Sequence, residues 1–267
     1  MLQNMSEQSF DDHLKGQSMQ FASWLQHRIG SRSAKQAWGL APAQKGWFLI
    51  GLGKEASRFM GVHTVQYFAG NLEDPSILGV SHGLRQSGAA RGAFQARQRV
   101  NMGLPMDQVV SGVLNIPLGL GPSDCEAEVQ LEAARALDLK PEEVSFDWQA
   151  DLKSDGVVDQ LHWVACAKSS IESFIQCVRR SGWQLASVEP ELQAAQRAAF
   201  CLSGGLAALL TRPVHDWQFD LALLPDSQAN GAALVRPLSL DPSLRDALRT
   251  SAGPRLVAAG LALKAWS

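Results

Sequence analysis

The fold is decided by two stretches: residues 109–117, VVSGVLNIP, and residues 123–148, SDCEAEVQLEAARALDLKPEEVSFDW. The first is a short apolar run that ends at a proline, which is typical of a strand. The second opens with Ser123 and has Glu126 three residues later, a pattern that predicts a capped helix start. Its apolar residues recur every three or four positions, and residues 144–148 then alternate as in a half-buried strand.

The same pattern continues toward the C-terminus. Residues 161–166 predict a strand, residues 171–178 predict an amphipathic helix, and Gly182 predicts the left-handed residue that ends it. A further strand follows at residues 183–188. The order is β-α-β-β-α-β, and we expect it to fold as one inserted subdomain in which both helices cover a small antiparallel sheet.

Four parts of the chain are distinguished by their patterns, and together they indicate an α/β (α+β) protein. Residues 1–46 are expected to form an appendage, helical or partly disordered. Residues 47–122 are expected to form a first subdomain, beginning with a strand at residue 47. Residues 123–190 form the inserted subdomain, and residues 191–267 a reduced second subdomain with closing helices.

Composition excludes several classes of protein. The chain has 267 residues, of which 46% are hydrophobic and 19% charged, so it is globular and not disordered. A net charge of -2 without long runs of one sign does not favour nucleic acid. The apolar stretches are shorter than the roughly 20 residues of a spanning helix, and the polar N-terminus does not predict a signal peptide.

The cysteines do not predict a metal site or a disulfide framework. The chain has four of them, and none belongs to a C-x-x-C pair. We expect buried thiols in a reducing compartment. The four are Cys125, Cys166, Cys177 and Cys201.

A glycine turn at residues 51–56, GLGKEA, matches the relaxed dinucleotide pattern G-x-G-x-x-[GA]. In that pattern the glycines let backbone amides approach a pyrophosphate at the start of a helix. Residues 60–68, MGVHTVQYF, favour a strand instead and leave no room for a crossover helix. A hairpin is the preferred interpretation, and a dinucleotide-dependent enzyme remains the alternative.

Two other groups of polar residues were weighed as sites. His215 and Asp216 suggest part of a hydrolase triad, but a G-x-S-x-G nucleophile elbow is absent from the sequence. Four aspartates at intervals of four residues suggest a weak cation site as an alternative, but a solvated turn is the preferred interpretation. These aspartates are Asp147, Asp151, Asp155 and Asp159.

The ordered series of motifs resembles the PilM family of type IV pilus assembly proteins, and its short HofM-type members most of all. The resemblance extends over residues 47–266 and is dense over residues 100–197. Its segments are residues 100–105 (VNMGLP), 109–117, 126–148, 164–168 (VACAK), 183–195 (WQLASVEPELQAA) and 256–263 (LVAAGLAL).

This resemblance implies an actin-like fold similar to that of the cell-division protein FtsA. It also implies a cytoplasmic protein that is peripheral at the inner membrane, as a component of a pilus, secretion or competence platform. The partner it implies is the cytoplasmic tail of a PilN-like bitopic membrane protein.

The nucleotide motifs of that family are degraded here. The first phosphate hairpin of the family contains an aspartate. The corresponding hairpin here is residues 51–58, and a glycine stands in place of that aspartate. Residues 217–240 lack the second D-x-G motif, and the adenosine loop is missing. A non-catalytic pseudo-ATPase scaffold is therefore implied, with Gly51, Gly53 and Lys54 as the remnant of a phosphate site. An active actin-like protein that binds Mg-ATP is the alternative.

Overall fold

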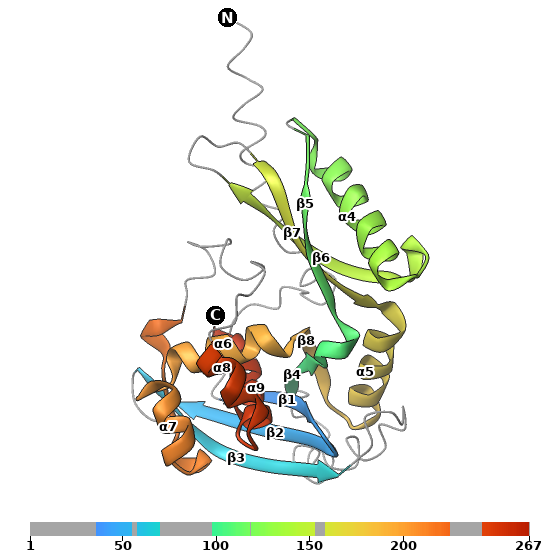
Figure 1. The fold of residues 1–267 in the computed structure, drawn as a ribbon. Helices are drawn as coiled ribbons and strands as arrows, with labels where there is room; N and C mark the ends of the chain where they lie inside the picture. The colour runs from blue at the N-terminus through green and yellow to red at the C-terminus, as the bar shows by residue number, and fades with distance from the viewer. Residues whose placement is uncertain are drawn as a thin grey trace, which may run out of the picture. The chain divides into compact units, whose positions relative to one another are not determined.

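The computed structural model describes residues 36–54, 58–69, 98–117, 119–152, 158–224 and 242–266. They form two units: residues Gln108–Lys168, and the described residues outside that range. Both units combine a sheet with helices (Figure 1). The chain is therefore an α/β protein, as the sequence predicts.

The larger unit contains a six-stranded sheet in the order β8-β4-β1-β2-β3-β9. The hairpin partners β1, β2 and β3 are antiparallel, whereas β4 and β8 run parallel to β1. Three antiparallel strands are thus followed along the chain by two parallel strands, so the sheet is mixed. The strands are β1 Gln36–Ala43, β2 Gly46–Lys54, β3 Phe59–Ala69, β4 Arg99–Leu104, β8 Gln184–Pro190 and β9 Gln218–Asp220.

Helices α6 and α9 cover one face of this sheet (Figure 1). The approach of α9 is so close that a Cβ atom on Gly39 of β1 would lie 2.0 Å from the carbonyl oxygen of Ala258. A Cβ atom on Gly260 of α9 would likewise lie 1.8 Å from the carbonyl oxygen of Ala194 in α6. The helices that follow β8 are α6 Glu191–Cys201, α7 Gly205–Thr211, α8 Pro242–Arg249 and α9 Gly253–Leu263.

The opposite face of the sheet contains the buried side chains of Trp38, Leu40, Trp47 and Leu49. Helix α5, Lys168–Arg180, packs there, since the rings of Trp47 and Phe174 meet edge to face with centroids 5.8 Å apart. Both faces of the central strands are therefore buried, as is usual for strands in a mixed α/β sheet.

Residues 36–46 are not part of an appendage, which corrects the expectation from sequence. They contain β1, the central strand of the sheet, and the turn into β2. The stretch QAWGLAPA is rich in alanine and contains Gly39 and Pro42, residues that favour a loop assignment. Close packing against α9 overrides these preferences. The helix expected near residues 21–29 lies outside the described residues.

The smaller unit is a three-stranded antiparallel sheet in the order β5-β7-β6, covered on one face by α4. Its core combines Val129 and Ala133 of α4 with Val144, Leu161 and Trp163 of the sheet. The elements are β5 Val110–Asn115, α4 Pro122–Leu137, β6 Val144–Leu152 and β7 Val158–Ala167.

The predicted order β-α-β-β-α-β is confirmed, and Gly182 has the expected positive φ of 85°. The grouping of these elements differs from the expectation. The second helix, α5, and the last strand, β8, belong to the larger unit, where β8 pairs in parallel with β4. The buried run at the end of β8 explains this placement, because such a strand needs cover on both faces.

Two other expectations differ from the structure. Helix α4 begins at Pro122 with Gly121 as its N-cap, so Ser123 does not form the predicted cap. Proline suits the first helical position because it has no amide hydrogen to leave unpaired. The described part of residues 191–267 also packs onto the larger sheet and contributes β9 as its sixth strand, instead of forming a second subdomain.

Candidate functional site

The predicted remnant of a phosphate site lies on an antiparallel hairpin. Gly51, Gly53 and Lys54 are at the end of β2, which pairs with β3. Residues 55–57 and the side chain of Lys54 lie outside the described residues. Since β3 is the antiparallel neighbour of β2, a crossover helix does not follow Gly53. The dinucleotide interpretation is therefore wrong, and the hairpin interpretation is confirmed.

The two glycines make room for aromatic side chains. A Cβ atom on Gly51 would lie 2.6 Å from Cε1 of His63 and 2.7 Å from Cζ3 of Trp38. A Cβ atom on Gly53 would lie 2.9 Å from Cδ2 of His63. Burial lowers the pKa of the His63 imidazole. The space above both glycines is thus filled by rings of the same sheet, which accounts for the glycines without a phosphate.

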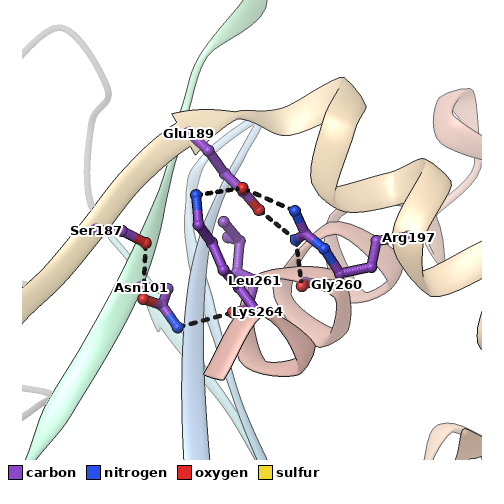
Figure 2. Close-up of polar contacts among 7 residues, drawn as sticks. All are labelled: Asn101, Ser187, Glu189, Arg197, Gly260, Leu261 and Lys264. Atoms are coloured by element: carbon purple, nitrogen blue, oxygen red, sulfur yellow. Dashed lines mark hydrogen bonds and ion pairs between the residues drawn. The ribbon is translucent and has the colours of Figure 1, made fainter. Parts of the chain in front are cut away.

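A cluster of buried charges joins β8 to the helices that follow it, as Figure 2 shows. Arg197 of α6 donates to both carboxylate oxygens of Glu189, at 2.5 and 3.0 Å, and to the carbonyl oxygen of Gly260 at 2.8 Å. Lys264, directly after α9, donates to Glu189 at 2.8 Å. Burial alone would raise the pKa of Glu189, but the charges of Arg197 and Lys264 outweigh it and lower this pKa to about 2.

A neutral pair of hydrogen bonds lies beside this cluster (Figure 2). The Oγ of Ser187 donates to the Oδ1 of Asn101 at 2.8 Å, and the Nδ2 of Asn101 donates to the carbonyl oxygen of Leu261 at 2.9 Å. The donors and acceptors of both groups are directed at one another and at the backbone of α9. We interpret the whole cluster as the anchor that fixes α9 on the sheet.

A second glutamate of unusual pKa lies nearby in sequence. Glu191 is the first residue of α6, and the backbone amide of Met106 donates to its carboxylate. Burial raises the pKa of Glu191 to about 7, and the negative charge of Asp107 acts in the same direction. This carboxyl group therefore changes charge near neutral pH.

The other residues considered from sequence form no site in the part of the chain that the structure describes. Groups of three or more potential metal-binding side chains are absent among these residues. Asp147 lies on β6, and the side chains of the other three aspartates are not described. His215 and Asp216 lie in a short 3-10 helix, Val214–Asp216. Within the described segments, no helix is long and apolar enough to cross a bilayer.

The described cysteines are free and buried, as expected: Cys125, Cys166 and Cys201. Burial raises the pKa of Cys166 to about 12 and that of Cys201 to about 11. Neither thiol is a nucleophile at neutral pH, because the thiolate is the reactive form. The side chain of Cys177 is not described.

The strongest candidate for a binding surface is the edge strand β5 of the smaller unit. Among the described residues β5 pairs only with β7, on one side, and the register runs without a bulge from Val110 to Asn115. Side chains on the face away from α4 are exposed: Ser111, Val113 and Asn115. Sequence analysis identified this strand but had no signal for its position at an edge, since that depends on pairing.

Gly112, in the middle of β5, lies directly opposite Trp163 of β7. A Cβ atom there would lie 2.7 Å from Cζ2 and 3.0 Å from Nε1 of the Trp163 indole. The indole therefore reaches over the edge strand, and only glycine leaves space for it. The side chain is 4% exposed, and its Nε1 has no hydrogen-bond partner among the described residues.

Comparison with known proteins finds similar solved structures, among them the following two. No protein-family model and no curated protein matches the chain. The cytoplasmic domain of EpsL, an inner membrane component of the type II secretion system of Vibrio cholerae, is 14% identical, with a TM-score of 0.44 over 60% of this chain and 58% of that one. A PilM-PilN type IV pilus biogenesis complex is 14% identical, with a TM-score of 0.48 over 68% of this chain and 53% of that one. The chain thus spans just over half the length of each.

Proposed function

We propose that this protein is a non-catalytic cytoplasmic scaffold of an inner-membrane assembly platform, of the kind that builds type IV pili or type II secretion systems. In this role it binds the extended cytoplasmic tail of a PilN-like membrane protein and is held at the membrane by that partner. The observation that carries the proposal is the edge of β5 in the smaller unit, which pairs only with β7 among the described strands. An added strand pairs with such an edge through main-chain hydrogen bonds.

The sequence of β5 supports this use of the edge. Proteins usually protect an edge strand with charged side chains, proline or a bulge, because an open edge pairs with other chains. Strand β5, VSGVLN, contains neither a charge nor a proline, and its pairing with β7 is regular. One of its exposed side chains, Val113, is apolar and is 42% exposed. These features favour an edge that receives a partner.

The partner class follows from the sequence resemblance to the PilM family, whose members bind the tail of PilN. The absence of catalysis is proposed from the same resemblance. The aspartate of the first phosphate hairpin is replaced by glycine, and the D-x-G motif of the second is missing from the sequence. The packing of Trp38 and His63 over Gly51 and Gly53 supports it, since these rings occupy the space above the glycine turn.

Titration calorimetry of the full chain tests the proposal. The probe is a synthetic peptide with the cytoplasmic N-terminal sequence of a PilN-like membrane protein from the same organism. We expect saturable binding that Val113→Lys weakens at least about tenfold, because a lysine on an edge opposes strand addition. Leu131→Lys is the matched control, since Leu131 is also an exposed apolar residue of the smaller unit, on α4. Absence of binding, or equal binding by both variants, contradicts the proposal.

A further inference from the structure

We infer that Trp163 selects the register of the bound tail: its indole N–H donates a hydrogen bond to a short polar side chain of the residue that lies opposite Gly112. The acceptor belongs to serine, threonine, asparagine or aspartate. This inference rests on the proposed function, because it describes how the tail is recognised at the β5 edge.

The first observation is a row of residues across the smaller sheet. Trp148 of β6, Trp163 of β7 and Gly112 of β5 are direct neighbours on the face covered by α4. Trp148 is the neighbour of Trp163 on the β6 side, whereas Gly112 on the β5 side has no side chain and leaves room for the indole. The nitrogen-bearing edge of the Trp163 indole therefore lies over β5, the outermost described strand of this sheet.

The second observation is the missing partner of that nitrogen. A buried tryptophan usually donates its N–H to an acceptor, because leaving a buried donor unpaired is unfavourable. Trp163 is 4% exposed, and its Nε1 is buried without a hydrogen bond. The side chains that form a hydrophobic cluster with Trp163 offer no acceptor, and no other described group accepts from Nε1. Within the described residues, the smaller unit therefore orients a donor toward its edge without supplying the acceptor.

An added strand can supply it. The strand would lie about 4.8 Å beyond β5, and the side chains that share the α4 face would alternate along it. The residue opposite Gly112 would meet no side chain from β5, so a short polar group there has a direct path to Nε1. Shifting the tail by one residue would turn that group to the other face and leave the donor unpaired.

The experiment combines binding with nuclear magnetic resonance on the full chain, using the same PilN-like peptide. Trp163→Phe removes the N–H but keeps an aromatic ring, and it also assigns the Trp163 signal among those of the eight indoles. Trp148→Phe is the matched control in the same row. We expect the peptide to move the Trp163 indole proton downfield and slow its exchange with solvent. Trp163→Phe should bind the peptide about three- to tenfold more weakly, and Trp148→Phe should bind it unchanged.

The position of the acceptor is then found by replacing each serine, threonine, asparagine and aspartate of the peptide with alanine. One replacement should weaken binding to the native protein and have no further effect on Trp163→Phe. If the native protein binds the peptide but the indole signal stays in place and Trp163→Phe binds equally well, the inference is overturned and the proposed function stands. If the native protein does not bind the peptide, both fail.

Discussion

Glu189 at the end of β8 and Arg197 of α6 form an ion pair whose two side chains are each only 3% exposed. Lys264 adds a second cation, 26% exposed, to the same carboxylate. The pair is the buried link between the last parallel strand and the helices α6 and α9. Each of these charges would be unfavourable to bury alone, and the attraction between them offsets that desolvation cost.

Removing one partner should therefore be far more harmful than breaking a surface pair. Arg197→Met leaves Glu189 buried without its main cation, and we expect the free energy of unfolding to fall by about 3–5 kcal/mol. Urea denaturation measures it. The control is Glu132→Gln, which breaks the exposed pair with Arg135 on α4 and should cost less than about 1 kcal/mol. Equal losses would show that the buried pair is no anchor.

Glu191 should make the protein less stable as the pH rises through neutrality. Its pKa of about 7 in the folded chain is above the ordinary value of 4.5, so folding favours the protonated form. The resulting stability is fully present below pH 4.5 and is lost as the pH rises through 7. Glu191→Gln keeps an acceptor for the amide of Met106. At pH 8 its free energy of unfolding should exceed that of the native protein by about 1–3 kcal/mol.

Melting temperatures at pH 5 and pH 8 measure this effect. The native protein should lose more stability between the two values than Glu191→Gln does. Glu172→Gln, an exposed change on α5, serves as the control and should follow the native protein. If the melting temperature of Glu191→Gln changed between pH 5 and pH 8 as much as that of the native protein, the assignment of this titration to Glu191 would be contradicted.

Gly51 should be intolerant of a side chain for reasons of packing. Gly51→Ala places a methyl group within 2.6 Å of His63 and 2.7 Å of Trp38, so we expect a loss of about 1–3 kcal/mol. His63→Ala empties part of that space, and the double variant should lose less than the sum of the two single changes. Thermal denaturation of the four proteins measures this coupling. Strictly additive losses would contradict the contact.

Mg-ATP should not bind to the protein. We expect no heat in a calorimetric titration and no rise in melting temperature at millimolar nucleotide, because a ligand of the folded state would raise it. Titration with Mg-ADP serves as a second probe. Micromolar binding with a clear rise in melting temperature would favour the alternative, an active actin-like protein.

Much of the fold could be predicted from sequence where local pattern and tertiary role agree. Helix α4 has clear periodicity, Gly182 ends α5 as expected, and the alternating start of β6 is a half-buried strand. The pattern failed for β1, where Gly39 and the alanines Ala37 and Ala41 serve close packing against α9 and not a loop. Local pattern also says nothing of which sheet a strand joins, so the place of β8 beside β4 was not predictable.

For the candidate site too, local sequence pattern predicted some features, whereas others depend on contacts between distant parts of the chain. The segment of β5 was predicted from sequence as a strand, within residues 109–117. Its position at an edge follows from pairing with β7 alone among the described strands, and pairing is a long-range property. The role of Gly112 follows from Trp163, 51 residues away in the numbering, and no local motif marks such a pair. Conversely, the glycines at 51 and 53 matched a local motif but serve the packing of Trp38 and His63.

Hydrogen–deuterium exchange of the full chain, with and without the PilN-like peptide, tests the central claim most directly. An added strand forms main-chain hydrogen bonds with β5, and exchange reports such bonds amide by amide. We expect the peptide to slow exchange in residues 110–115 and to leave exchange in the hairpin of β2 and β3 unchanged. Peptide binding that leaves exchange in residues 110–115 unaltered would contradict it.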